Sequence, residues 1–191
     1  MNSFPFDEEK SIAAVLYIIE KVGGSIDMHK LAKILYFADQ KHLVKYGRTV
    51  VGDEYVPMEF GPVPSHIYSA VKDINKAMSY KLFAKYLSLD LSAGMRVIRS
   101  FSKPNLDELS KSDVACVDEA IRENQDLSFD ELVKKSHKKA WTNAAQKNLR
   151  FISIEDIATE AGATEEMVEY IKDNMSDYNL VLPKFSAPCH C

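Results

Sequence analysis

The chain has 191 residues, a formal net charge of −4 and a sequence pI near 5.8, so it offers no general positive field that would gather nucleic acid. Hydrophobic residues make up 46% and charged residues 27%, which excludes a disordered or fibrous protein. Cysteine is present three times, twice within the last three residues, which argues against a disulfide framework. We therefore expect a single reduced, folded domain over residues 1–191.

The N-terminal sequence MNSFPFDEEKS has no basic region followed by an apolar core and a small-residue cleavage site, so it does not resemble a secretory signal. The most apolar run, residues 12–19, ends at Glu20 and Lys21 and is too short to cross a bilayer. These features predict a cytoplasmic protein with no membrane span.

The first two predicted helices lie near the N-terminus. Residues 8–22 carry one apolar stripe that ends at a pair of glycines. The second helix should span 28–46, with Asp27 as its N-cap and Gly47 as a left-handed residue at its end. Because it is apolar around most of its circumference, we expect it to be the central helix, packed on several sides.

Two short antiparallel hairpins are expected to follow and to form one small sheet. The first should contain residues 49–60, with its turn at 52–53. The prolines of 61–64 predict a stiff extended connection into a helix over 64–76. The second hairpin should pair residues 85–91 with residues 95–101.

The rest of the chain is predicted to be helical. Ser112 should start a helix that reaches Asn124, and Ser128 with Glu131 forms a capping box for a helix that continues to about Ala144. Two shorter helices are expected at 154–161 and 164–174. The predicted fold is therefore mainly α, of the α+β class, with about six to seven helices around the helix at 28–46 and a small antiparallel sheet.

Two separated segments carry a family resemblance. Residues 29–38, HKLAKILYFA, are followed some twenty residues later by Phe60-Gly61-Pro62-Val63 and by Tyr68. This pattern resembles the signature of the Panacea (SocA-like) antitoxin domain, which also occurs in proteins described as phage-associated or GepA-like. Ser136-His137 and Trp141 are similar to a later feature of the family, and the resemblance covers about residues 10–145.

The resemblance implies a protein that acts by binding rather than by catalysis. It implies an antitoxin that neutralises a cognate protein toxin through direct contact, with delivery of the toxin to an ATP-dependent protease as a variant of that theme. Two alternatives remain at this point. One is a nucleic-acid-binding transcriptional regulator, and the other is a phage or mobile-element protein that acts on a host factor.

Three surfaces are candidates for the partner contact. They are the rim of the 60–63 connection, the exposed flank of the central helix, and the acidic C-terminal helices, which could occupy the positive cleft of a toxin that attacks RNA or nucleotides. The candidate residues on these surfaces are Tyr36, Val44, Phe60, Pro62, Val63, Tyr68, Glu165, Glu166 and Glu169.

Residues 151–178 have the spacing of a helix-turn-helix, with 165–171 in the place of a recognition helix. Their charge opposes that function. Acidic residues crowd this stretch, whereas Lys172 is the one basic residue between 155 and 177, so the DNA backbone would repel it. We therefore do not expect DNA as a partner.

No catalytic, cofactor or metal site is expected. Ser65 and His66 are adjacent on a predicted helix, so their side chains point about 100° apart and cannot act as nucleophile and base. His42 should be a hydrogen-bonded core residue. Cys189-His190-Cys191 lacks the spacing of a folded zinc site and should belong to a flexible tail at 183–191. The lysines at 134, 135, 138 and 139 should form one solvated face of a helix.

Overall fold

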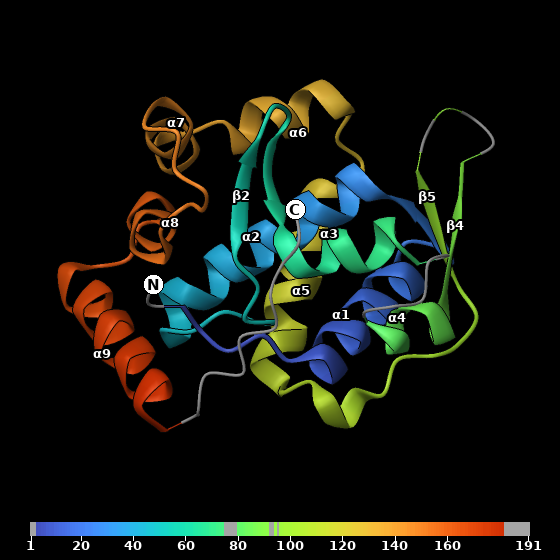
Figure 1. The fold of residues 1–191 in the computed structure, drawn as a ribbon, viewed down its shortest axis with the longest axis horizontal. Helices are drawn as coiled ribbons and strands as arrows, with labels where there is room; N and C mark the ends of the chain where they lie inside the picture. Colours follow the sequence, from blue (N-terminus) through green and yellow to red (C-terminus); the bar gives the residue numbers. More distant parts are fainter. Residues whose placement is uncertain (1–2, 75–79, 92–93, 95, 182–191) are drawn as a thin grey trace.

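Helix α2 (Met28–Tyr46) runs through the middle of the molecule, as its apolar circumference predicts (Figure 1). In the computed structural model, which describes residues 3–74, 80–91, 94 and 96–181, Asp27 caps this helix by accepting a hydrogen bond from the N–H of Lys30 at 2.8 Å. Gly47 ends it in the left-handed conformation at φ 66°. Both predicted ends of the central helix are thus confirmed.

The described residues form nine α-helices, one short 3-10 helix and five short strands, which confirms the expected mainly α, α+β class. The other helices are α1 (Glu8–Lys21), α3 (Ser65–Lys72), α4 (Lys81–Tyr86), η1 (Leu106–Glu108), α5 (Lys111–Asn124), α6 (Phe129–Ser136), α7 (Lys139–Gln146), α8 (Ile154–Ala161) and α9 (Glu165–Val181). The strands are β1 (Ser25–Asp27), β2 (Tyr55–Met58), β3 (Gly61–Pro64), β4 (Leu87–Asp90) and β5 (Val97–Ser100).

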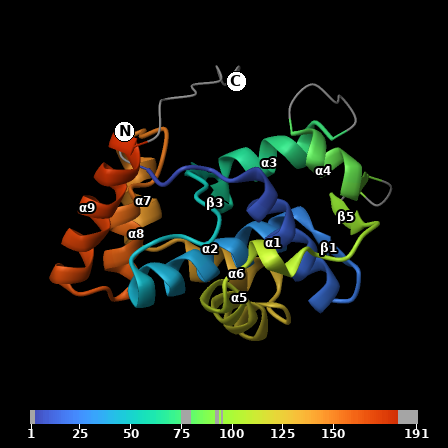
Figure 2. The ribbon, with the colours of Figure 1, turned by 90° about the horizontal axis from the view of Figure 1, so that it is seen from below.

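The helices cover α2 from several sides. Figure 2 shows α5 and α6 on one side of α2, and α3 with α4 on the opposite side. Helices α7, α8 and α9 lie together at one end of the molecule in both views. No helix within the described ranges has the length and apolar character that a membrane span requires.

The two hairpins lie in separate sheets, so the prediction of one common sheet is wrong. Strands β4 and β5 pair antiparallel as expected, but β5 also pairs with β1 in the order β1-β5-β4. Strand β1 was missed because its three residues are too few to show an alternating pattern. The expected turn residues 92 and 93 lie outside the described residues.

The first hairpin is also shifted from its predicted position. Its turn is at Glu59-Phe60, and residues 61–64, expected to be a connection, are the second strand. Pro57 lies opposite Pro62 in this two-stranded ladder, where the missing N–H groups of proline can face outward. Residues 49–51 are instead a buried loop, because the N–H of Val50 donates to Asp39 Oδ1 at 2.6 Å rather than to a strand.

The helix predicted from Ser128 to Ala144 is two helices, separated at His137 and Lys138. The capping box of Ser128 with Glu131 is present as predicted. A distant residue explains the break, because Glu160 of α8 accepts a hydrogen bond from the N–H of Ala140 at 2.7 Å and so caps the new helix α7. The four lysines around this break therefore do not share one helical face.

Three further helix boundaries differ from prediction. Helix α5 begins after Ser110, which forms a capping box with Asp113, so Ser112 is not the N-cap. Helix α4 was not predicted, and α9 extends to Val181 rather than to residue 174. The helix expected at 64–76 ends at Lys72, and the predicted tail at 183–191 lies outside the described residues.

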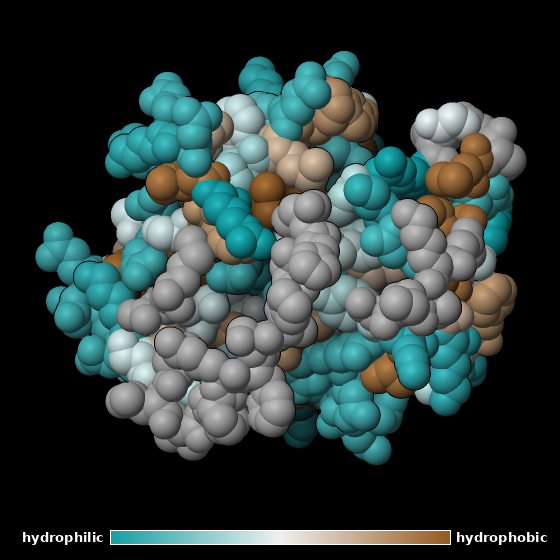
Figure 3. Space-filling view, viewed as in Figure 1, coloured by the Kyte–Doolittle hydropathy of each residue, from teal (hydrophilic) through white to brown (hydrophobic). Residues whose placement is uncertain are grey.

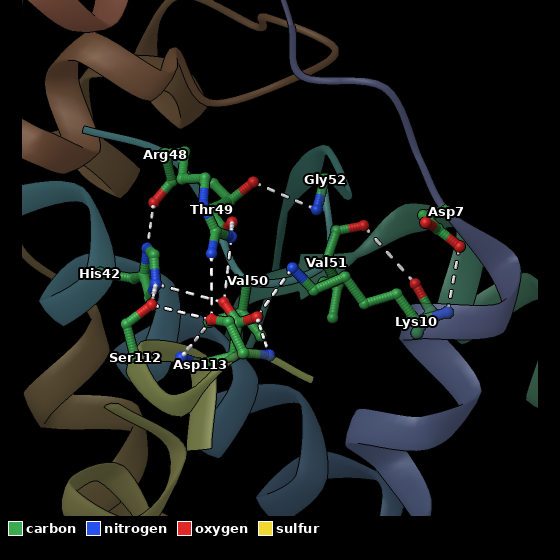
Figure 4. A network of polar contacts seen from close by, with 12 residues as sticks. Asp7, Lys10, His42, Arg48, Thr49, Val50, Val51, Gly52, Ser112 and Asp113 are labelled. Carbon is green, nitrogen blue, oxygen red and sulfur yellow. Dashed lines mark hydrogen bonds and ion pairs between the residues drawn. The ribbon is translucent and has the colours of Figure 1, made fainter. Parts of the chain in front are cut away.

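A buried ionic network joins α1, α2 and α5 (Figure 4). The carboxylate of Asp113 lies 2.9 Å from Lys10 Nζ, 2.9 Å from Arg48 Nη1 and 3.1 Å from His42 Nε2. Burial alone would raise the pKa of Asp113. Hydrogen bonds to its carboxylate instead hold this pKa well below its usual range, and they come from His42, Lys10, Ser110 and Arg48. The prediction that His42 is a hydrogen-bonded core residue is confirmed, since it is fully buried.

Candidate partner-binding surface

Residues from three distant segments converge beneath the turn of the β2–β3 hairpin. Lys33 comes from α2, Gly61 begins β3, and Ser136 and His137 lie at the end of α6. A Cβ atom on residue 61 would lie 2.6 Å from Ser136 Oγ, 2.8 Å from Lys33 Nζ and 3.2 Å from His137 Cδ2. With its φ of 102°, Gly61 is therefore required both by the space and by the backbone.

Lys33 is fully buried, at 0% exposure, although it carries an ammonium group. Its Nζ donates a hydrogen bond to the carbonyl oxygen of Pro62 at 3.0 Å, and no carboxylate of the described part of the chain forms an ion pair with it. Burial lowers the pKa of Lys33 to about 7. Near neutral pH, the side chain is thus divided between its charged and neutral forms.

His137 lies beside Lys33 and contains a second unsatisfied polar group. Its Nε2 atom is buried and has no hydrogen-bond partner among the described residues. Burial, followed by the charge of Lys33, lowers the pKa of His137. The ring is stacked on Trp141 with centroids 3.7 Å apart and planes 5° apart, while Trp141 Nε1 donates to the carbonyl of Met58 at 2.9 Å. His137 is therefore held firmly next to the hairpin.

Large apolar side chains surround this cluster at the surface. Phe60 is 49% exposed, Phe129 is 48% exposed and Met58 is 40% exposed. The Phe60 and Phe129 rings meet edge to face with centroids 5.3 Å apart, and His29 lies 4.2 Å from Phe129. We call Met58, Phe60, Phe129, His29 and Trp141 the hairpin-tip surface. Figure 3 shows apolar side chains reaching the surface around the hairpin and α6.

The chain matches the family described as antitoxin SocA-like, Panacea domain, over residues 31–142, which is more than half of its length. The chain belongs to the SocA-like, Panacea antitoxin family. This confirms the family resemblance that residues 29–38 and 60–63 indicate. No curated protein and no solved structure matches the chain.

The residues matched to the Panacea domain include nearly all of the hairpin-tip surface and of the cluster beneath it. Lys33, Gly61, Phe129 and Trp141 fall inside it, and His29 lies two positions before its start. Membership of an antitoxin family gives the protein a general role in a toxin–antitoxin system. Helices α8 and α9 follow the end of the match.

The expectation of an exposed flank on the central helix is wrong for Tyr36. This side chain is fully buried, its hydroxyl donates to Glu160 Oε1 at 3.3 Å, and burial raises its pKa. Helix α8, which carries Glu160, covers this side of α2. Val44 is only half-buried. The helical pattern places Tyr36 on a flank of α2, but it does not show that another helix covers that flank.

The residues predicted around the 60–63 connection differ in accessibility. Phe60 lies at the surface as expected, whereas Pro62 is buried and Val63 is half-buried. The half-buried Tyr68 accepts a hydrogen bond from Arg96 Nη1 at 2.6 Å. Of these four candidates, Phe60 offers a partner the largest apolar contact.

The predicted acidic residues Glu165, Glu166 and Glu169 are exposed on α9. At about 100° per residue they share an arc of about 120° with Asp173 and Asp177, opposite the buried Ile171 and Met175. We call these five carboxylates the acidic stripe. Tyr170 packs over Gly47, so α9 also covers the end of α2.

The structure also identifies site residues that the sequence did not single out. Lys33 and Phe129 were not proposed as functional, and Ser136-His137 was noted only as a family feature. Nothing in the sequence distinguishes Lys33, because the same helix also contains Lys30, Lys41 and Lys45. The meeting of α2, β3 and α6 at Gly61 could not be inferred from local pattern.

Proposed function

We propose that this Panacea-domain protein is the antitoxin of a toxin–antitoxin pair, and that it neutralises a protein toxin by direct binding through the hairpin-tip surface, without catalysis. The observation that carries this proposal is the pair of half-exposed aromatic rings of Phe60 and Phe129. Exposed aromatic side chains that pack on one another are typical of the few residues that dominate binding energy.

The surface is also preorganised for binding. The Trp141 indole holds the carbonyl of Met58, and His29 Nε2 lies 3.3 Å from the carbonyl oxygen of Phe60. Both contacts join the hairpin turn to neighbouring helices. A surface that is already ordered loses less conformational entropy on association, which favours tight binding of a partner.

The position of the surface within the family match supports the same proposal. The hairpin-tip surface lies on elements that the family description covers, whereas the acidic stripe lies on α9, beyond residue 142. If antitoxins of one family bind their toxins in a similar way, the binding surface is expected within the residues that the family has in common. The acidic stripe is therefore the competing surface against which the proposal is tested.

The test is a growth assay in which the protein encoded by the neighbouring reading frame is expressed with and without this chain. Wild-type chain should restore growth and copurify with that protein. Phe60→Ala and Phe129→Ala should each weaken the complex by about 2 kcal/mol, or about 30-fold in Kd. Phe101→Ala is the matched control, because Phe101 is 70% exposed but lies at the end of β5.

A second variant separates the two surfaces. Reversing Glu165, Glu166 and Glu169 to lysine should leave neutralisation unchanged if the hairpin-tip surface makes the contact. Loss of protection in this variant, with full protection by both phenylalanine variants, would move the contact to the acidic stripe. If the wild-type chain neither restores growth nor copurifies with the neighbouring protein, the antitoxin proposal itself is wrong.

A further inference from the structure

A group of exposed basic side chains on α6, on α7 and after α7 lies beside the hairpin-tip surface. We propose that the toxin meets this region with an acidic protein surface, whose carboxylates pair with the basic side chains while its apolar side chains pack on Phe60 and Phe129. This inference rests on the proposed function and specifies the charge of the partner. The basic side chains are those of Lys134, Lys138, Lys139, Lys147 and Arg150, which we call the basic face.

Positive charge is concentrated in one stretch of a chain that is acidic overall. The net charge is −4, yet residues 132–150 contain six lysine and arginine residues and no aspartate or glutamate. Of these six, Lys135 points inward, since it is half-buried and its Nζ donates to Asn124 Oδ1 at 2.7 Å. The five residues of the basic face are exposed, and its four lysines have no ion-pair partner in the part of the chain that the structure describes.

Local stability does not explain two of these lysines. Helices α1, α2, α5, α6 and α8 each begin at an aspartate or serine whose side chain accepts a backbone N–H hydrogen bond. Helix α7 begins instead at Lys138, whose side chain makes no such bond, and Lys139 follows. Because the start of a helix carries partial positive charge, lysines are unfavourable there. Residues that oppose local stability in this way are typical of functional sites.

The basic face is continuous with the hairpin-tip surface. Phe129 begins α6, and Lys134 lies five residues later on the same helix. Lys138 directly follows His137, whose ring stacks on Trp141. Helix α7 also packs against β2 of the hairpin, and Figure 3 shows hydrophilic side chains over α7 beside the apolar side chains around the hairpin. One partner surface can therefore contact both groups.

The surroundings favour an acidic protein over a nucleic acid. The Phe129 ring lies 5.3 Å from the Phe60 ring and 4.2 Å from the His29 ring between centroids, so these rings pack on one another instead of standing free to stack on bases. The exposed Glu59 and Asp130 lie in the hairpin turn and at the start of α6, where they would repel a phosphate backbone. A protein surface can place its carboxylates opposite the lysines alone.

Complementary charge of this kind acts mainly on the rate of association. Exposed ion pairs contribute little to the final affinity, but opposite charges attract each other over about one Debye length before the two surfaces touch. The basic face should therefore raise the association rate constant, whereas Phe60 and Phe129 should determine the dissociation rate constant. Kinetic measurements can separate the two groups.

The test is stopped-flow kinetics of the full chain with the purified protein from the neighbouring reading frame, at 50 mM and at 500 mM NaCl, which shortens the Debye length from about 14 Å to about 4 Å. The association rate constant of wild type should fall roughly tenfold between these concentrations. At 50 mM NaCl, the triple variant Lys134→Glu, Lys138→Glu, Lys139→Glu should associate at least roughly tenfold more slowly than wild type, with little change in its dissociation rate constant. Circular dichroism checks its fold.

Two comparison variants make the result specific. The triple variant Lys72→Glu, Lys81→Glu, Lys85→Glu is the matched control, because it changes the net charge equally at exposed lysines of α3 and α4. It should associate much faster than the variant of the basic face. Phe60→Ala should instead raise the dissociation rate constant and leave the association rate constant nearly unchanged.

Association of wild type that does not depend on salt, or equal association rates of the two triple variants, would overturn this inference and leave the antitoxin proposal standing. A gel shift of duplex DNA or RNA that the variant of the basic face abolishes would overturn it too, because the face would then bind nucleic acid. A salt-sensitive dimer of the chain alone in sedimentation velocity, lost in the same variant, would assign the face to a second copy. Absence of binding by wild type would instead overturn the proposed function.

Discussion

Replacing Lys33 by methionine should change how the stability of the free protein depends on pH. The pKa of Lys33 is lowered by burial to about 7, whereas an exposed lysine titrates near 10.5. At pH 7 the unfolded chain therefore binds more protons at this residue than the folded chain does. Because the folded pKa is the lower one, the cost of burying this lysine is largest at low pH and diminishes as the pH rises from 7 toward 10.5.

The magnitude follows from that pKa difference. The burial of Lys33 costs about 4 kcal/mol of unfolding free energy at pH 7 and about 2 kcal/mol at pH 9. Methionine has a similar length and no charge, so Lys33→Met removes this dependence. The lost hydrogen bond to the carbonyl of Pro62 affects the variant equally at both pH values.

The assay is urea-induced unfolding of wild type and Lys33→Met at pH 7 and pH 9. The stability of wild type relative to the variant should rise by about 2 kcal/mol between these two values. All other titrating groups are common to both proteins and cancel in the comparison. A difference between the two proteins that stays the same from pH 7 to pH 9 would refute the reasoning, because it would mean that Lys33 remains charged in the folded state.

The remaining predictions concern the packing around Gly61 and two carboxylates that join distant elements, the half-buried Glu160 and the buried Asp113. Gly61→Ala should lower the free energy of urea unfolding by about 3 kcal/mol, because the added Cβ meets three side chains. Gly24 has a similar φ of 93° but open space around it, so Gly24→Ala should lower the free energy by only about 1 kcal/mol. Equal losses in the two variants would contradict the close approach at Gly61. Glu160→Ala should destabilise the fold by about 2 kcal/mol and speed hydrogen exchange in α7, while the exposed Glu165→Ala should change stability by under about 0.5 kcal/mol. Asp113→Ala should cost about 3 kcal/mol at pH 7 by leaving the half-buried cations of Lys10 and Arg48 without their shared carboxylate. Since the folded pKa of Asp113 is below its usual value, wild type loses this advantage as the pH falls below about 4, and a deficit that persists undiminished at pH 3 would contradict that pairing.

The helix ends were predictable because their causes are local. Asp27 bonds an N–H three residues away, and Gly47 adopts a left-handed conformation that glycine accepts without strain. Ser128 with Glu131 forms its capping box within one turn. Each of these signals involves residues that are neighbours in the sequence, so the pattern alone is sufficient to place the boundary.

The first hairpin was misplaced because only tertiary contacts decide whether residues 49–51 form a strand or a loop. Residues 49–51 have the composition of a strand, but Asp39 on α2 accepts the N–H of Val50 and the hydroxyl of Tyr55 at 2.7 Å. Burial is the largest influence on Asp39 and raises its pKa to about 6. A buried carboxylate on a helix thus holds this segment as a loop, and the pairing moves to residues 55–64.

The break between α6 and α7 has the same origin. The sequence from Ser128 to Ala144 has no residue that must end a helix, and it was predicted as continuous. Glu160, twenty residues beyond Ala140, supplies the acceptor that starts α7, and it also binds Tyr36 of the central helix. The same contact explains why Tyr36 is buried rather than exposed on a flank.

By itself, the sequence determined the family, the mainly α class and the central helix with both of its ends. It could do so because apolar periodicity, helix caps and the Gly-Pro-Val segment are properties of adjacent residues. Only the tertiary structure decided that Lys33, Gly61 and His137 meet under two exposed phenylalanines. That meeting depends on how α2, β3 and α6 pack together, and the free energy of such packing comes from contacts between residues that are far apart along the chain.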